Sequence, residues 1–328
     1  MDKLIAQFPK HISDAIDIAK NAVLHIDNSI QFENVVICGM GGSGIGGKLV
    51  AQWFSESAKT PIISVQSYDL PAFVNEKSLV IGSSYSGNTE ETISVIHQAH
   101  KRRATIIGVC SGGELYKFCK ENNYDCIKVP GGNPPRSMLA FSLIQLVHIL
   151  SKSGVIAKEA LKEIDHCRHL LNTELLAIKQ EAKKLASFIH NKQCIIYTSS
   201  NLEAVAIRAR QQFNENSKIL CWHHVFPEMN HNELVGWGGG NDKLAPVYLI
   251  SSFLSERNKL RANLSKEIML KKTPHLLEIN GKGSSLIEES FYFIHIVDWA
   301  SIYLAELYGV DPVEIKVIDY LKDSLSNT

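Results

Sequence analysis

Short apolar runs alternate with helix-length amphipathic segments along the chain, and this alternation restricts the possible folds more than any other feature of the sequence. Helix-length stretches such as 47–57 and 89–102 separate the runs of the first half. Those runs occupy residues 35–38, 62–65, 79–81, 105–109 and 125–129. This order is typical of a parallel sheet whose strands are joined by crossover helices, so the sequence predicts an α/β fold.

The second half of the chain repeats this order and ends in a long helix, expected at 287–307. The apolar runs before that helix occupy residues 194–197, 219–222, 247–251 and 275–279. In both halves one apolar strand leads into Ser-Ser and then a helix, which indicates an internal duplication. We therefore expect two domains built on one plan, 1–152 and 153–328, joined through a polar helix at 157–186.

Charge and composition argue against several classes of protein. The 328 residues carry 34 Lys and Arg against 34 Asp and Glu, which leaves no electrostatic footprint for nucleic acid or an anionic membrane surface. The most apolar stretch, 138–156, is interrupted by polar residues and is predicted to be a buried helix rather than a membrane span. Residues 1–20 do not resemble a secretory signal, and the seven cysteines form no CxxC pair, so we expect reduced thiols and a cytoplasmic protein.

The loop at 39–44, Gly-Met-Gly-Gly-Ser-Gly, follows a predicted strand and is the first candidate site. Glycines at a strand-to-helix turn let backbone N–H groups approach an anion, so a phosphate is the expected ligand. The same letters satisfy GxGxxG, and a dinucleotide site with Asp69 as ribose acceptor stays open. A tight turn without any ligand is the other alternative.

A second loop, at the end of the next predicted strand, brings together the hydroxyls of Ser84, Ser86 and Thr89 before Glu90 and Glu91 open a helix. Hydroxyls and free N–H groups at a helix start suit a compact phosphate monoester, and a dinucleotide would not need this second cradle. A cluster of helix caps is the alternative, although one cap uses one hydroxyl. We favour the phosphate-binding interpretation.

A third loop, rich in glycine and proline, places Arg136 before an apolar helix. A planar guanidinium on a stiff loop can stabilise a developing oxyanion or clamp a phosphate. The alternative is a solvated surface arginine.

Candidate acid and base groups lie further along the chain, at Glu215 and His231. We expect both on loops flanked by amides, where a carboxylate can take a carbon-bound proton while an imidazole moves protons on oxygen. A metal site is the alternative, with ligands from His223, His224, Glu228, His231 and Glu233. It is not favoured, because no spacing among them places ligands on one helical face as HExxH does. His223 and His224 are expected at a strand end without a special role.

Together, six motifs make the chain resemble the bifunctional phosphoglucose/phosphomannose isomerases, members of the sugar isomerase (SIS) superfamily. The motifs are GMGGSGIGG at 39–47, SYSGNTEET at 84–92, PPRS at 134–137, NENSK at 214–218, FPEMNHNE at 226–233 and WASIYLAELYGVDP at 299–312. The resemblance implies two SIS domains, each a parallel sheet between helical layers, and a homodimer with active sites at the subunit interface. It also implies interconversion of glucose 6-phosphate, and of mannose 6-phosphate, with fructose 6-phosphate.

The resemblance further implies a role for individual residues. The substrate-binding residues would be Gly42, Ser43, Ser84, Ser86 and Thr89. Glu215 would move a proton between C1 and C2, and Arg136 would stabilise the cis-enediolate. His231, supplied by the neighbouring subunit, and Lys322 of the terminal helix would assist ring opening. Neither a metal nor a cofactor is implied.

Alternatives from other classes stay open. A non-catalytic SIS module would bind a sugar phosphate and regulate a partner without needing Glu215 and His231. A nicotinamide-dependent oxidoreductase would bind a dinucleotide at the first loop. An isomerase of a pentose or seven-carbon phosphosugar would share all the catalytic residues. Relatives with dual specificity tend to carry a small hydroxyl residue after Gly-Val-Asp-Pro, where this chain has Val-Glu-Ile at 313–315, so mannose 6-phosphate is the weaker expectation.

Overall fold

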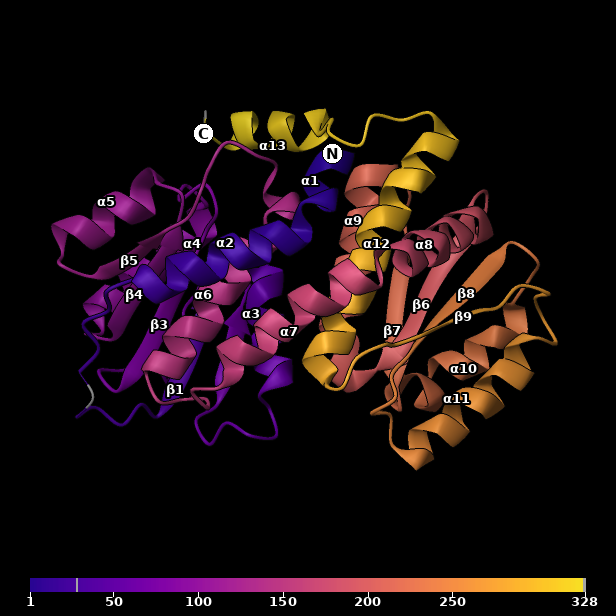
Figure 1. Ribbon diagram of the computed structural model, residues 1–328, viewed down its shortest axis with the longest axis horizontal. Coiled ribbons are helices and arrows are strands. Elements are labelled where there is room, and N and C mark those ends of the chain that lie inside the picture. Colours follow the sequence, from indigo (N-terminus) through magenta and orange to yellow (C-terminus); the bar gives the residue numbers. More distant parts are fainter. Residues whose placement is uncertain (28, 327–328) are drawn as a thin grey trace. The chain divides into compact units, whose positions relative to one another are not determined.

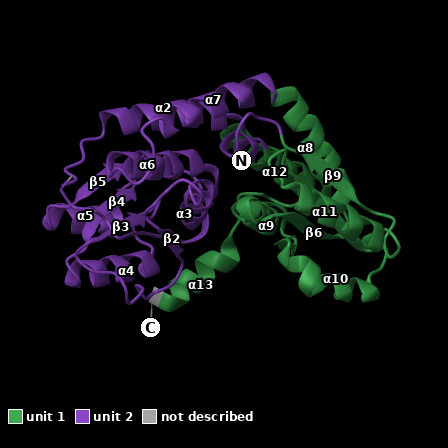
Figure 2. Ribbon diagram, turned by 90° about the horizontal axis from the view of Figure 1, so that it is seen from below, with its two compact units in different colours: residues 1–5, 175–281, 293–328 green, residues 6–174, 282–292 purple. Residues whose placement is uncertain are grey.

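The computed structural model describes residues 1–27 and 29–326 and contains two parallel sheets (Figure 1). The chain forms two compact units, which are coloured separately in Figure 2. Unit 1 comprises residues 1–5, 175–281 and 293–328, and unit 2 comprises residues 6–174 and 282–292. The predicted α/β fold with parallel sheets flanked by helices is confirmed.

Unit 2 contains a five-stranded parallel sheet in the order β2-β1-β3-β4-β5. Its strands are β1 (Asn34–Cys38), β2 (Ile62–Val65), β3 (Ser78–Ser83), β4 (Thr105–Cys110) and β5 (Asp125–Lys128). Its main helices are α2 (Phe8–Asn21), α3 (Gly41–Trp53), α4 (Glu90–Lys101), α5 (Gly113–Glu121), α6 (Leu139–Lys152) and α7 (Ala160–Thr173), with the 3-10 turn η1 (Pro135–Ser137) before α6. The short helix α1 (Asp2–Ala6) precedes α2.

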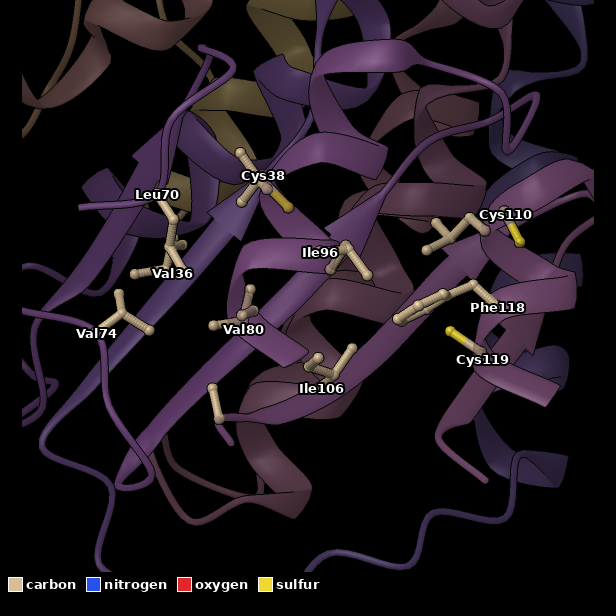
Figure 3. Close-up of a cluster of buried hydrophobic side chains, with 14 residues drawn as sticks. Val36, Cys38, Leu70, Val74, Val80, Ile96, Ile106, Cys110, Phe118 and Cys119 are labelled. Atoms are coloured by element: carbon tan, nitrogen blue, oxygen red, sulfur yellow. The ribbon is translucent and has the colours of Figure 1, made fainter. Parts of the chain in front are cut away.

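The sheet of unit 2 lies between two layers of helices. Val36, Val80 and Ile106 project from one face and pack with apolar side chains of α4 and α5, as Figure 3 shows. On the other side α6 packs against α3, α2 and α7. Every residue from Leu139 to Leu150 in α6 is buried, as expected of a helix that is apolar on all sides. The buried helix predicted at 138–156 is therefore confirmed over Leu139–Lys152, where α6 ends.

Unit 1 contains a four-stranded parallel sheet in the order β7-β6-β8-β9. Its strands are β6 (Gln193–Ser199), β7 (Trp222–Phe226), β8 (Leu244–Ile250) and β9 (Leu277–Asn280). Its helices are α8 (Leu175–Ile189), α9 (Glu203–Ser217), α10 (Glu233–Gly236), α11 (Glu256–Met269) and α13 (Lys316–Ser326), with 3-10 turns η2 (Ser200–Leu202), η3 (Glu228–His231) and η4 (Trp237–Gly239). The core includes Tyr197, Phe226 and Tyr248 of the sheet, packed with Ala262 and Met269 of α11.

The helix α12 (Leu286–Tyr308) contributes to both units, so residues 282–292 of unit 2 interrupt unit 1 in the sequence. Residues 1–5 are a further separate segment of unit 1. In unit 2, Phe291 of α12 stacks on Phe8 and Trp53 with ring centroids 5.8 and 5.7 Å apart. From residue 293 onward the helix belongs to unit 1. The boundary that we predict between the two duplicated halves, at residues 152 and 153, stays a prediction.

Two predicted elements are wrong in detail. The strand expected at 219–222 is only a connection, because Lys218 adopts a left-handed conformation (φ 60°) that ends α9, and β7 begins at Trp222. Leu220 in that connection is 76% exposed, so its apolar side chain does not mark a buried strand. The polar helix expected at 157–186 is two helices, α7 and α8, separated at Glu174 and belonging to different units.

Candidate functional site

The first two predicted loops lie at the carboxyl edge of the unit 2 sheet, at its topological switch point. The chain leaves β1 toward β2 on one side and then crosses to β3, which pairs with the other side of β1. In open parallel sheets, ligands bind in the crevice between the loops that follow two such strands. The glycine loop follows β1 and the hydroxyl loop follows β3, so both lie where the fold provides a binding crevice.

Direct contacts join all three predicted loops of unit 2 into one assembly. The Ser43 hydroxyl accepts a hydrogen bond from the Tyr85 N–H (3.0 Å), which links the first loop to the second. The Tyr85 hydroxyl accepts one from the Asn133 N–H (3.3 Å), which links the second loop to the third. A Cβ built on Gly42 would lie 3.3 Å from the N and Cα atoms of Arg136, so the first and third loops also touch.

The hydroxyl loop brings Ser84 and Thr89 into contact, with their side-chain oxygens 2.8 Å apart. Ser86 lies on the same loop, but it is exposed and its hydroxyl accepts from the Asn88 N–H (3.2 Å). Thr89 is the N-cap residue of α4, yet its side chain makes no capping bond to that helix. The helix-cap alternative therefore does not account for Thr89.

Helices α3 and α4 both begin at this assembly. Among the described residues, no side chain caps the first N–H groups of either helix. The N-cap residue of α3 is Met40, whose side chain cannot accept a capping bond, and that of α4 is Thr89. The first N–H groups of a helix have no partner within the helix, and together with the helix dipole they favour an anion. Both helix starts therefore offer N–H groups of the kind that favour an anion such as phosphate.

The hydroxyl loop is held rigidly by the neighbouring turn after β4. The Asn88 side-chain oxygen accepts from the Glu114 N–H, and the Tyr85 carbonyl accepts from the Ser111 N–H, both at 2.9 Å. Gly87 has φ 75°, and a Cβ there would lie 1.8 Å from the Gly112 carbonyl oxygen. Only glycine fits that position, which explains the Ser-Gly-Asn step of the motif.

Arg136 lies in η1 and is only 6% exposed, so the alternative of a solvated surface arginine is wrong. Ser137 stabilises the turn, because its hydroxyl and its N–H both donate to the Pro134 carbonyl, at 2.7 and 3.0 Å. The backbone of Arg136 is therefore held against Gly42 by a stiff turn. A buried guanidinium on such a turn can act as a fixed positive charge.

Glu215 lies in the last turn of α9, in unit 1, and not on a loop as predicted. Helix α9 continues through Asn216 and Ser217 because both side chains are buried in unit 1, and Lys218 then ends it. The Glu215 side chain itself is half-buried. The polar sequence Asn-Glu-Asn-Ser predicts a loop because the sequence alone does not show these tertiary contacts.

His231 is exposed at the end of η3, on a segment that its neighbours hold in place. The Asn230 amide donates to the Ser265 hydroxyl of α11 (2.7 Å), and the Asn232 amide donates to the Glu228 carboxylate (2.8 Å). The flanking amides noted in the sequence therefore hold this segment through side-chain hydrogen bonds, and the His231 side chain is exposed.

Glu233 fixes the same segment to the sheet. Its carboxylate accepts a short hydrogen bond from the Tyr197 hydroxyl, which in turn accepts from the Trp237 indole N–H (3.0 Å). Burial, followed by the hydrogen bond to Glu233, raises the pKa of Tyr197, so its hydroxyl remains a donor. This network gives Glu233 a structural role near His231, so its position needs no catalytic explanation.

Two of the three histidines of the metal alternative, His223 and His224, lie next to different carboxylates. His223 and His224 lie inside β7 and not at a strand end, and successive strand residues face opposite sides of a sheet. His223 Nε2 is 3.5 Å from Glu203, and His224 Nδ1 is 3.8 Å from Glu233. Across residues 1–27 and 29–326, no three His, Cys, Asp or Glu side chains are grouped so that they could hold a metal ion.

Glu215 and His231 lie at opposite edges of the unit 1 sheet. Helix α9 follows β6 and returns to the amino edge, because the next parallel strand, β7, begins there only a few residues after α9 ends. His231 lies beyond the carboxyl end of β7. The five residues of β7 span roughly 15 Å, so the two side chains of one unit are far apart.

Lys322 lies on α13, where it is exposed. Several apolar side chains of the same helix are exposed as well, Val317 and Tyr320 among them. In the part of the chain that the structure describes, Lys322 has no ion-pair partner, and no contact places it beside Glu215 or His231. Its role therefore stays a prediction.

Comparisons with known proteins agree with this architecture. Residues 30–125 match the SIS domain family, and residues 178–325 match the family described as bacterial phospho-glucose isomerase C-terminal SIS domain. The bifunctional phosphoglucose/phosphomannose isomerase of Caldicellulosiruptor bescii is 35% identical over 99% of this chain and 99% of its own length. The chain belongs to the bifunctional phosphoglucose/phosphomannose isomerase family. The member from Aquifex aeolicus is also 35% identical, over 94% of this chain and 93% of its own.

The fold likeness extends beyond this isomerase family. The C-terminal domain of glucosamine-fructose-6-phosphate aminotransferase from Francisella tularensis matches with a TM-score of 0.73 at 16% identity, covering 96% of this chain and 97% of its own. At that identity the likeness concerns the fold alone. Helices long and apolar enough to cross a membrane are not found among the described residues.

Sequence reasoning missed the residues that connect the loops of this family member. Tyr85 and Asn133 join the second and third loops, and Ser301 of α12 contacts the residues that follow Glu215. Tyr85 and Ser301 both lie inside motifs shared with the family, at 84–92 and 299–312. Their presence in these motifs was the available signal, but only the contacts reveal what they do.

Proposed function

We propose that the protein is an aldose-ketose isomerase that interconverts glucose 6-phosphate with fructose 6-phosphate and also accepts mannose 6-phosphate. The observation that carries this proposal is the loop assembly at the switch point of unit 2, in a chain that matches these isomerases over nearly its full length. The assembly supplies hydroxyls, helix starts and a buried arginine, which suit a sugar phosphate.

The phosphate is bound by the residues named from the motifs, namely Gly42, Ser43, Ser84, Ser86 and Thr89. A phosphate monoester carries up to two negative charges and needs several donors in addition to charge balance. The contact between Ser84 and Thr89 supports their joint role, because both hydroxyls then lie at one point of the crevice. Ser86, which is exposed on the same loop, would approach the phosphate from the outer side.

The proton transfers follow from the chemistry of the substrate. The sugar ring must open before the C2 proton becomes acidic beside a carbonyl group, and His231 and Lys322 move protons among the ring oxygen, O1 and water. Glu215 then takes the proton from C2 and returns it to C1. Arg136 faces the enediolate oxygens with a fixed positive charge, an effect commonly on the order of 3 kcal/mol per donor. No step uses a metal or a cofactor.

The protein acts as a homodimer in this proposal, with His231 completing the site of the second copy. The placement of Glu215 and His231 at opposite edges of the unit 1 sheet supports this assignment, since one unit cannot bring both to the same carbon atoms. Mixing an inactive Glu215→Gln chain with an inactive His231→Ala chain should restore some active sites. No recovery in demonstrably exchanged heterodimers would refute donation across the interface.

Mannose 6-phosphate is included because the relatives from Caldicellulosiruptor bescii and Aquifex aeolicus are named for both activities. Turnover of mannose 6-phosphate in addition to glucose 6-phosphate requires a pocket that presents C2 of either epimer to one base. Dual specificity tends to go with a hydroxyl residue after Gly-Val-Asp-Pro, and the Val-Glu-Ile sequence at 313–315 has none, so glucose 6-phosphate is the principal aldose. We expect the enzyme to serve glycolysis and gluconeogenesis in the cytoplasm.

Proton NMR of fructose 6-phosphate incubated with purified, EDTA-treated protein tests the reaction directly. Glucose 6-phosphate should appear first and mannose 6-phosphate more slowly. Turnover that stops with EDTA would contradict the metal-free mechanism. If the sugar phosphate binds but neither aldose forms, the protein is a binding module or an isomerase of another phosphosugar, which pentose and seven-carbon ketose phosphates would distinguish. Tight binding of a nicotinamide dinucleotide would instead favour an oxidoreductase.

A further inference from the structure

We propose that Asn216, Ser217 and Ser301 form a positioning site that holds Glu215 in place for proton transfer. This inference rests on the proposed function, because it concerns the base of that reaction. None of the three residues is a catalytic residue, since each acts on Glu215 through the backbone. The site joins two motifs of the sequence, at 214–218 and 299–312, and gives a role to Asn216, Ser217 and Ser301, which the mechanism does not otherwise use.

Both residues that follow Glu215 are attached to a single serine of α12. The Asn216 amide donates to the Ser301 hydroxyl (2.9 Å), and the Ser217 hydroxyl donates to the Ser301 carbonyl (2.7 Å). Asn216 and Ser301 are 0% exposed, so these bonds form away from water. The Ser301 hydroxyl also donates to the Asp298 carbonyl (2.7 Å), which fixes its orientation.

These bonds act where a helix is least secure. The last turn of a helix lacks intrahelical partners for its carbonyl groups and frays readily. Glu215 lies in that turn, so its backbone would otherwise move with the helix end. The Lys218 ammonium adds a further constraint, because it donates to the Glu215 carbonyl (2.5 Å) and to the Glu314 carbonyl (2.8 Å).

Two residues upstream on the same face of α9 fix the rotation of the helix. Arg208 and Gln212 precede Asn216 at intervals of four residues, which places all three side chains on one side. The Arg208 guanidinium donates to both carboxylate oxygens of Asp298, at 3.1 and 2.7 Å, and the Gln212 amide donates to the same carboxylate at 2.8 Å. With this face attached to α12, the direction of Glu215 is set by the geometry of the helix.

Loss of the Ser301 hydroxyl should affect the chemical step more than substrate binding. The phosphate-binding residues lie in unit 2 and do not depend on Ser301, so the KM for the sugar phosphate should change little. The base, however, would lose one of the bonds that define its position. A misplacement of about 1 Å in a catalytic group can cost roughly 100-fold in rate. We therefore expect kcat to fall about 10- to 100-fold in Ser301→Ala, with KM within about threefold.

Ser290→Ala is a closely matched control on the same helix. Ser290 is also 0% exposed, accepts a hydrogen bond from the Trp53 indole N–H (2.9 Å) and donates to the Leu286 carbonyl (2.7 Å). Ser301 likewise accepts one side-chain N–H at 2.9 Å and donates to one backbone carbonyl at 2.7 Å. Each substitution therefore removes the same number of buried hydrogen bonds, but only Ser301→Ala does so next to the residues that hold Glu215.

The experiment compares kcat, KM, the thermal midpoint and the kinetic isotope effect with C2-deuterated glucose 6-phosphate in wild type, Ser301→Ala and Ser290→Ala. The inference predicts similar thermal shifts in both variants, a selective fall in kcat in Ser301→Ala, and a larger isotope effect there because proton abstraction limits the rate. Equal kcat values in the two variants would overturn it, and so would an unchanged isotope effect in a slowed Ser301→Ala. If Ser301→Ala does not fold, Ser217→Ala replaces it with the same criteria. An inactive wild type would refute the proposed function itself and the inference with it.

Discussion

Replacing Gly42 by alanine should slow catalysis without destabilising the protein. Gly42 lies in the first turn of α3, and an added Cβ would be 3.3 Å from the N and Cα atoms of Arg136 and from the carbonyl carbon of Pro135. These neighbours are backbone atoms, so they cannot turn away as a flexible side chain can. The turn that carries Arg136 must therefore move to make room.

The size of the effect follows from that contact. An ordinary Cβ contact is 3.4–4 Å, so the Arg136 turn must shift by a few tenths of an ångström. If a 1 Å error costs about 100-fold and the free energy scales linearly, a shift of about 0.3–0.5 Å costs roughly 4- to 10-fold in kcat. Replacing glycine by alanine inside a helix is worth about 0.5–1 kcal/mol, which offsets the tight contact, so the unfolding free energy should stay within about 1 kcal/mol of wild type.

The assay is steady-state conversion of fructose 6-phosphate together with urea unfolding, and Gly46→Ala is the control. A Cβ on Gly46, one turn further along α3, would also have its nearest neighbour at 3.3 Å, but that neighbour is the end of the flexible Leu146 side chain. Gly46→Ala should therefore keep its kcat within about twofold. KM separates the two possible effects of Gly42→Ala, because a Cβ that blocks the phosphate raises KM while a displaced Arg136 lowers kcat. An unchanged kcat in Gly42→Ala, or an equal fall in both variants, would refute the reasoning.

Other parts of the structure give further expectations. Ser84→Ala should raise the KM for fructose 6-phosphate by roughly tenfold or more, because a hydrogen bond to a charged group is worth about 1.5–3 kcal/mol; steady-state kinetics that show an unchanged KM would remove it from the phosphate site. Asp298→Leu should lower the unfolding free energy by about 3–5 kcal/mol, since it leaves the Arg208 charge buried without its carboxylate; a loss below about 1 kcal/mol in urea titration would contradict this. Burial lowers the pKa of His295 from 6.5 to about 3. As the pH falls, the unfolded chain therefore takes up a proton at this position before the folded chain does. The stability that the neutral His295 side chain contributes is complete above pH 6.5 and is lost as the pH falls toward 3. Below pH 6.5 the unfolding free energy of wild type should therefore fall more steeply than that of His295→Gln, by up to about 1.4 kcal/mol per pH unit; equal slopes in urea titrations at several pH values would contradict this.

The parts of the fold and site that could be predicted from the sequence depend on local patterns. A parallel strand buried on both faces is a short apolar run, so β1, β3 and β4 contain their predicted runs. The edge strand β2 is only partly buried, but it also occurs at the predicted residues. Glycine and hydroxyl clusters at strand ends indicate an anion site for reasons of backbone geometry, and the contact of Ser84 with Thr89 agrees with that prediction. Local patterns were thus sufficient to single out the loops at which we propose that the phosphate binds.

The base side of the site could not be described from the sequence, because it depends on contacts between distant residues. Asn216 and Ser301 are 85 residues apart in the chain, and their bond helps to keep Glu215 in the last turn of a helix and not on a loop. The same helix end displaces β7 from its predicted position. The burial of Arg136 against Gly42 likewise joins two loops that no local pattern connects.

The central claim is that Glu215 moves a proton between C2 and C1 of a sugar phosphate bound by the loops of unit 2. Wild type and Glu215→Gln should therefore be compared in deuterated water, with fructose 6-phosphate binding measured by calorimetry and aldose formation and C2 deuteration by NMR. We predict that Glu215→Gln binds with a Kd within about threefold of wild type, while formation of glucose 6-phosphate falls by about 100- to 10,000-fold, the range for removal of a general base. Formation of the aldose by Glu215→Gln at a rate near that of wild type would contradict the account.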